Sequence, residues 1–158
     1  MTVFKRRSEM TDRERIISVS LIIIICLTLL FIFFQSILPP AASKEESDSV
    51  AGILSLIFPR DSFIIKNIRE IAHFLEYGLL GVEISLYVCF FACKPFAASA
   101  ASFAIALLVA TIDEIIQIFS GRVADILDVC TDFSGFVTLS IITYAVCFFI
   151  FPKKKRNL

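Results

Sequence analysis

Four runs of apolar residues, each long enough to cross a lipid bilayer, constrain this chain more than any other feature. An α-helix needs about 20 predominantly apolar residues to span a hydrocarbon core of roughly 30 Å. Hydrophobic residues make up 58% of the sequence, against about 45–50% in soluble globular proteins. We therefore predict an all-α integral membrane protein, a four-helix transmembrane bundle. Its predicted spans cover about 16–38, 71–92, 96–119 and 126–151.

The first apolar run follows a charged stretch, residues 1–15, in an arrangement that secretory signals also show. The apolar region of a signal is typically about 7–15 residues long. The run 16–38 is longer than that and nearly uncharged. We expect it to remain in the protein as the first transmembrane helix.

Between the first and second runs lies a mixed segment, residues 39–69, which we expect as an outer loop. It contains the short apolar stretch 50–58, which is too short to span a membrane as a helix. We expect this stretch to lie in the membrane interface or to re-enter slightly, packed against protein. The later connections, at 93–95 and 120–124, are short, so the helices that they join are expected to be antiparallel neighbours.

The basic residues are divided unevenly between the two sides of the membrane. Segments on the side of the termini hold ten Lys and Arg residues, and segments on the other side hold five. Because Lys and Arg are enriched in cytoplasmic segments, we expect both termini in the cytoplasm. The predicted organisation is a basic N-terminus 1–15, one transmembrane domain 16–151 and a basic tail 152–158.

The charge balance and the cysteines argue against two further classes. Lys and Arg number 15 and Asp and Glu number 15, so no general basic field indicates a nucleic-acid partner. The five cysteines form no CxxC pair and lie in or beside apolar segments. We interpret them as small apolar residues, and neither a disulfide framework nor a zinc knuckle is expected.

Ionisable residues inside the last three runs are the most informative polar feature. A charged group at a helix centre costs about 2.5–3.5 kcal/mol on insertion scales, so these groups must face one another, face water or be protonated. Their spacings place them on single helix faces, and most lie near the outer ends of the helices. Glu83 is the exception, about 10 Å deeper than Glu76. The residues are, run by run, His73, Glu76 and Glu83, then Asp113, Glu114 and Gln117, then Asp125, Asp128 and Asp132.

Two glycines in the second run, Gly78 and Gly81, have a structural interpretation. Small residues in transmembrane helices allow neighbouring backbones to approach closely. We expect these two to mark a close helix–helix contact.

Three motifs in series carry a resemblance to a known family. They are the segments 69–81 (REIAHFLEYGLLG), 113–117 (DEIIQ) and 121–135, which contains GR followed by DVCTDFSG. In this order and spacing they resemble the signatures of the VanZ-like family, and 34–36 resembles the polar end of its first helix. Two departures are Glu70, where Lys is frequent, and Ser120, where Pro is usual. The resemblance covers almost the whole chain and implies a bacterial plasma-membrane protein linked to resistance against glycopeptides such as teicoplanin.

The convergent residues have two interpretations. They are either an interhelical hydrogen-bond network that serves packing, or a polar pocket open to the outer face, which their number and charge favour. We predict for this pocket Arg69, His73, Glu76, Tyr77, Asp113, Glu114, Gln117, Arg122, Asp125, Asp128 and Asp132. Six of them are also candidate metal ligands: His73, Glu76, Asp113, Glu114, Asp128 and Asp132.

Three functions remain open at this point. In the first, the protein binds or shields a glycopeptide antibiotic or a lipid-linked wall precursor, and Arg69 and Arg122 hold its phosphate or carboxylate. In the second, it is a membrane-embedded enzyme in which a divalent cation, Mg²⁺, Mn²⁺ or Ca²⁺, is the cofactor and a carboxylate or His73 is the acid or base. In the third, it is a small transporter or an ion-coupled oligomer, for which a homo-oligomer is a possible assembly. Membrane lipids are expected partners in every case.

Overall fold

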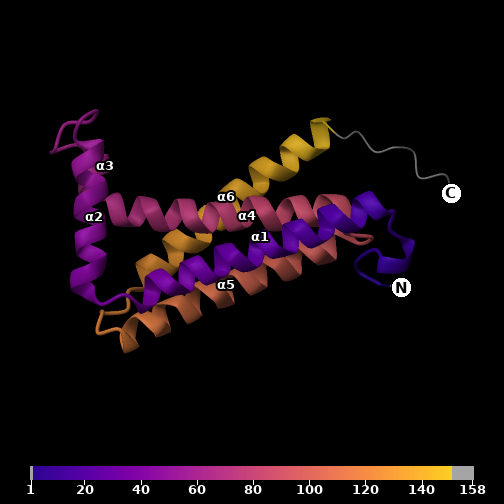
Figure 1. Cartoon of the computed structure of the whole chain (residues 1–158), viewed down its shortest axis with the longest axis horizontal. Coiled ribbons are helices and arrows are strands. Elements are labelled where there is room, and N and C mark those ends of the chain that lie inside the picture. The colour runs from indigo at the N-terminus through magenta and orange to yellow at the C-terminus, as the bar shows by residue number, and fades with distance from the viewer. Residues whose placement is uncertain (1, 151–158) are drawn as a thin grey trace.

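The computed structural model describes residues 2–150, and within them four long helices form a bundle (Figure 1). Each is long and apolar enough to cross a membrane. The prediction of an all-α, four-helix membrane protein is therefore confirmed. The predicted basic tail, 152–158, lies outside the described residues. The four helices are α1 (Asp12–Ile37), α4 (Ile68–Phe91), α5 (Pro95–Phe119) and α6 (Ile126–Ile150).

Local signals other than hydropathy mark where α1 and α5 begin. Thr11 caps α1: its hydroxyl accepts a hydrogen bond from the Glu14 N–H over 3.3 Å, and its own N–H donates to the Glu14 carboxylate over 2.8 Å. α5 begins at Pro95, whose fixed φ suits the first helical turn. As a result, α1 begins at Asp12, four residues before the predicted start at position 16.

The segment 39–69, expected as an outer loop, contains two helices, α2 (Pro40–Leu54) and α3 (Phe63–Lys66). α2 runs across the end of the bundle that lies opposite the N-terminal residues (Figure 1). The apolar stretch 50–58 forms the end of α2 and the turn after it, and Leu56 and Ile57 there are 85% and 77% exposed. Its place in the membrane interface stays a prediction.

The contact between α4 and α6 is the most extensive in the bundle. A Cβ atom at Gly81 would lie 2.5 Å from the Phe136 carbonyl oxygen, and one at Gly135 would overlap the backbone of Phe74. Backbone therefore lies directly against backbone. The predicted close contact at Gly78 and Gly81 is confirmed, and Gly135 supplies the facing surface on α6.

We expect Gly135→Ala to destabilise the bundle, because the new methyl group forces α4 and α6 apart. The free energy of unfolding should fall by about 1–3 kcal/mol, the usual range for overpacking. Unfolding of the purified protein in mixed detergent and SDS, followed by helical circular dichroism, measures this change.

The matched control is Gly52→Ala in α2, where an added Cβ has nothing within 4 Å. This substitution should be neutral or stabilising by a few tenths of a kcal/mol. Equal losses in the two variants would contradict the close contact.

Candidate functional site

Polar side chains gather at the end of the bundle that α2 crosses. α1 and α5 end there, and α4 and α6 begin there (Figure 1). The polar faces of α4, α5 and α6 therefore meet at one level. The last turn of α1 adds Gln35 and Ser36 to them.

A buried His–Asp–Asp group lies at the centre of this cluster. Asp113 and Asp132 are both fully buried, with 0% of each residue exposed. The His73 Nδ1 and Asp132 Oδ1 atoms are 3.2 Å apart. One ligand atom from each of His73, Asp113 and Asp132 lies within 4.8 Å of the others. Three of the six predicted metal-ligand candidates thus come within reach of one cation.

Asp113 joins α5 to α1. Its carboxylate accepts a hydrogen bond from the Ser36 hydroxyl and another, of 3.1 Å, from the Gln117 amide. Spacings of four and three residues allow either Asp113 or Glu114 to share a helix face with Gln117. Asp113 does so, and Glu114 points to the start of α6.

Several hydrogen-bonding atoms in the cluster have no partner among the residues that the structure describes. They include the second carboxylate oxygen of Asp132, the Oε1 atom of Glu114 and the hydroxyl of the fully buried Tyr77. A buried polar atom without a partner costs about 1–3 kcal/mol. A network built only for packing would be expected to satisfy these atoms.

Asp125, predicted as part of the pocket, has its carboxylate elsewhere. It is exposed, and its Oδ1 accepts a hydrogen bond of 2.9 Å from the Leu127 N–H at the start of α6. Its own N–H donates to the buried Glu114 carboxylate over 2.9 Å. Asp125 therefore caps α6, since it precedes the helix and accepts this hydrogen bond. It does not continue the stripe that Asp128 and Asp132 form on the helix.

Two arginines flank the entrance to the cluster. Arg69 forms an ion pair of 2.6 Å with Asp128. Arg122 donates to the Gln117 side chain and to the Gln35 carbonyl, each over 3.3 Å. Burial lowers the pKa of the Arg122 guanidinium, and the positive charge of Arg69 lowers it further. The two arginines line the same cavities, so their positive charges face a common space.

Two neighbouring cavities open between α2 and these arginines. They share Ser43, Ser47, Arg69 and Arg122 as lining residues. The outer cavity, of about 320 Å³, also has Lys44 on its wall. The inner one, of about 50 Å³, has His73 and Glu76 on its wall and holds only a few atoms. The two cavities together form a pocket. Its entrance is basic, and its inner wall carries carboxylates and the His73 imidazole.

The contribution of α2 was not predicted from the sequence. Ser43, Glu46 and Ser47 line the inner cavity, and their spacing of three and four residues places them on one helix face. That spacing after Pro40, a favoured first helical residue, was the signal that could have indicated a helix in place of a loop.

Glu83 lies apart from the cluster, as its depth predicted. It is buried, and the Thr28 hydroxyl of α1 donates to its carboxyl group over 2.8 Å. Its second oxygen has no partner in the described part of the chain.

A comparison with protein families gives one match. The family model described as VanZ/LLP1 matches residues 21–150, most of the chain. The matched range contains every residue of the polar cluster. No curated protein and no solved structure matches the chain.

Proposed function

The chain belongs to the VanZ/LLP1 family, and from this premise we propose that it binds an anionic group of a cell-envelope component at the outer face of the membrane. The anion is the phosphate or terminal carboxylate of a lipid-linked wall precursor. The observation that carries this proposal is the pair of arginines, Arg69 and Arg122, on the walls of both cavities.

The orientation rests on the basic residues. The side of the termini holds twice as many Lys and Arg residues as the other side, which favours cytoplasmic termini in a bacterial plasma membrane. The polar cluster, at the opposite end of the bundle, then faces outward. Wall precursors are accessible from that side.

The arginines retain hydrogen-bonding capacity for an anion. A guanidinium group has five N–H donors in a fork that matches phosphate and carboxylate. The buried Nε of Arg122 has no partner among the described residues, and Arg69 uses Nη2 for its bond to Asp128. The hydroxyls of Ser43 and Ser47 lie on the same cavity wall. An anion between the two arginines would also relieve their mutual repulsion.

We expect the purified protein to bind a polyisoprenyl phosphate more tightly than the matching uncharged alcohol. Arg122→Ala should weaken phosphate binding at least tenfold, since a hydrogen bond to a charged group contributes about 1.5–3 kcal/mol. Native mass spectrometry of the detergent-solubilised protein measures both affinities.

Arg60→Ala is the matched control, because Arg60 is exposed at the same end of the molecule and lines neither of these two cavities. It should bind the phosphate as the wild type does. Equal affinity for the phosphate and the alcohol would contradict the proposal.

The proposal extends to the glycopeptide resistance that the family resemblance implies. A protein that holds the precursor, or the antibiotic, at the outer face would reduce exposure of the drug target. Cells that produce the wild-type protein should then tolerate more teicoplanin than cells that produce Arg122→Ala or His73→Ala.

Matched membrane levels of each variant are required for this comparison, and Arg60→Ala again serves as the control. If the Arg122 and His73 variants protect as well as the wild type, the cluster has no part in resistance. Binding of the phosphate can still be observed in that case, so the two parts of the proposal fail separately.

A second candidate function, metal-dependent chemistry, is favoured by a different observation. His73, Asp113 and Asp132 offer ligand atoms within 4.8 Å of one another, and the second carboxylate oxygen of the buried Asp132 has no partner among residues 2–150. Carboxylates with one imidazole suit Mn²⁺ or Zn²⁺, and carboxylates alone suit Mg²⁺ or Ca²⁺. A cation below the two arginines would place positive charge on both sides of a phosphate, as phosphoryl transfer requires.

For this second function we expect the purified protein to bind Mn²⁺ and Asp132→Asn to weaken that binding at least tenfold. Loss of the free Mn²⁺ signal in electron paramagnetic resonance measures the binding. Glu83→Gln is the control, because it removes a buried carboxyl group away from the three ligands and should leave Mn²⁺ binding unchanged. A wild-type protein that binds neither Mn²⁺ nor Zn²⁺ would reduce the three residues to a hydrogen-bonded group.

A further inference from the structure

The N-terminal residues are fixed against the opposite end of the bundle. The N–H groups of Cys93 and Lys94 donate to the Val3 carbonyl over 2.8 and 3.2 Å, and the Lys5 N–H donates to the Phe91 carbonyl over 2.9 Å. A short 3-10 turn, η1 (Arg7–Glu9), then leads to α1. The basic residues of this segment are therefore held in place by backbone hydrogen bonds.

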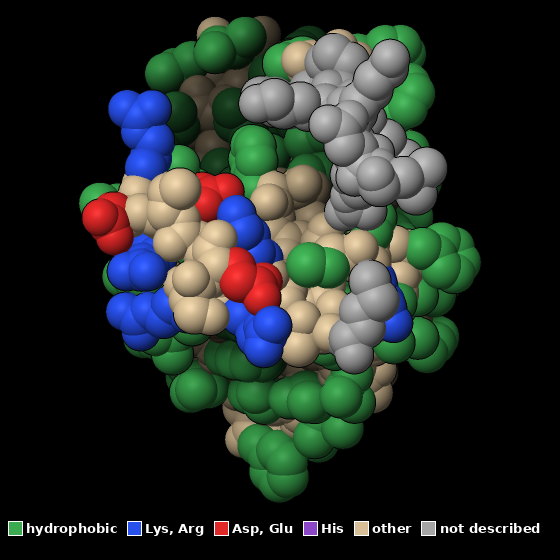
Figure 2. Space-filling view, turned by 90° about the vertical axis from the view of Figure 1, so that its right-hand side faces the viewer, with side chains coloured by type: hydrophobic (Ala, Val, Ile, Leu, Met, Phe, Trp, Pro, Cys, Tyr) green, Lys and Arg blue, Asp and Glu red, His purple; other side chains and the backbone are tan. Residues whose placement is uncertain are grey.

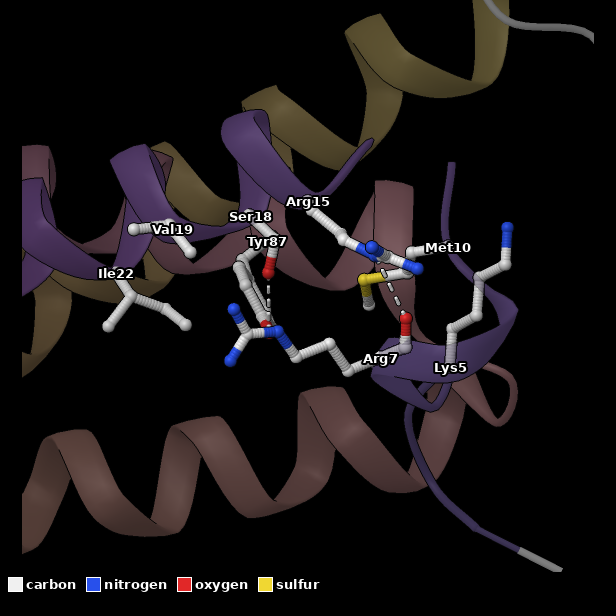
Figure 3. Close-up of a pocket in the computed structure, with 8 residues that line it drawn as sticks. All are labelled: Lys5, Arg7, Met10, Arg15, Ser18, Val19, Ile22 and Tyr87. Atoms are coloured by element: carbon white, nitrogen blue, oxygen red, sulfur yellow. Dashed lines mark hydrogen bonds between the residues drawn. The ribbon is translucent and has the colours of Figure 1, made fainter. Parts of the chain in front are cut away.

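A cavity of about 250 Å³ lies between this segment, α1 and α4. One part of its wall is basic and the other is apolar (Figure 3). The Ser18 and Tyr87 hydroxyls, 3.3 Å apart, join α1 to α4 between the two parts. The lining residues are Lys5, Arg7, Met10, Arg15, Ser18, Val19, Ile22 and Tyr87.

The basic residues of this cavity differ in how they are paired. Lys5 forms an ion pair of 2.9 Å with Glu14, and Arg15 forms one of 3.2 Å with Asp12. Arg7 has no ion pair or side-chain hydrogen bond within residues 2–150. Its side chain extends along the cavity whose wall also includes Ser18 and Tyr87 (Figure 3). A cation without a counter-charge is thus present where the apolar part of α1 begins.

The charged and hydrophobic side chains around the cavity indicate which kind of ligand fits it. Figure 2, which views this end of the molecule, shows Lys and Arg side chains with a few Asp and Glu side chains among them and hydrophobic side chains above and below. Val19 and Ile22 are 47% and 45% exposed, and Ile22 lies about 10 Å along the helix from Arg15. The wall therefore extends from the depth of lipid phosphates to that of acyl chains.

We propose that this cavity binds an anionic phospholipid of the leaflet on the side of the termini, with its phosphate on Arg7 and an acyl chain along Val19 and Ile22. Free phosphate would use the basic part of the wall alone, whereas a phospholipid uses both parts. The inference is independent of the anion site at the other end of the bundle.

The test is lipid retention by the full-length protein in native mass spectrometry. Wild-type protein should retain phosphatidylglycerol in preference to phosphatidylcholine, and Arg7→Ala should reduce phosphatidylglycerol binding about fivefold, the effect of one basic residue at a lipid surface. Val19→Trp, which fills the apolar part without a change of charge, should also reduce it.

Arg6→Ala is the matched control, because it removes the same charge from a residue that is paired with Glu9 over 2.8 Å and does not line the cavity. If Arg6→Ala lowers binding as much as Arg7→Ala does, the attraction is diffuse and the proposal is overturned. Equal retention of the two lipids, or displacement of the lipid by inorganic phosphate alone, overturns it as well.

Discussion

Backbone contact between α4 and α6 fixes the geometry on which the polar cluster depends. Gly135 lies against the backbone of Phe74. Phe74 directly follows His73 on α4, and Gly135 lies about one helical turn after Asp132 on α6. Two pairs across the same interface, His73 with Asp132 and Arg69 with Asp128, are 3.2 and 2.6 Å apart. A wider separation of the two helices would lengthen both, so the absence of a side chain at Gly135 is a condition for the charged groups to meet.

Buried polar side-chain atoms without a hydrogen-bond partner are concentrated at one end of the bundle. Elsewhere in the bundle, Thr28 pairs with Glu83 and Ser99 with Tyr144 over 2.9 Å, and two buried atoms, Glu83 Oε2 and Ser85 Oγ, have no partner among the described residues. At the end beside α2, four buried side-chain atoms lack a partner within the part of the chain that the structure describes, on Tyr77, Glu114, Arg122 and Asp132. Since an unpaired polar group is costly at low dielectric, this excess supports a ligand-binding role over a purely structural one.

Much of this arrangement was predictable from the sequence, because the membrane makes hydropathy a strong constraint. The helical class, the four spanning helices and the family were predicted and are confirmed. Which of Asp113 and Glu114 hydrogen-bonds to Gln117 could not be predicted from spacing, because one is four residues and the other three residues before it. The packing of α5 against α1 and α6 decides it.

Other features depended on local signals that were weaker than hydropathy. The helix α2 was missed because its composition is that of a loop, with charged and serine residues throughout. Asp125 was assigned to the pocket because periodicity continues past a helix start, where a side chain turns to the backbone instead. At Asp125 the relevant force is a hydrogen bond between neighbours in sequence, and in α2 the signal was the spacing of three and four residues after Pro40.

The hydrogen bonds that hold Val3 to Cys93 and Lys94 have a consequence for biosynthesis. Their acceptor is made about ninety residues before their donors. Contacts of such long sequence separation form late. The first span must therefore enter the bilayer with its leading residues unattached, and those residues can dock only once the turn between α4 and α5 has formed. Closure of this end of the bundle thus reports that the second span and the turn after it have been made.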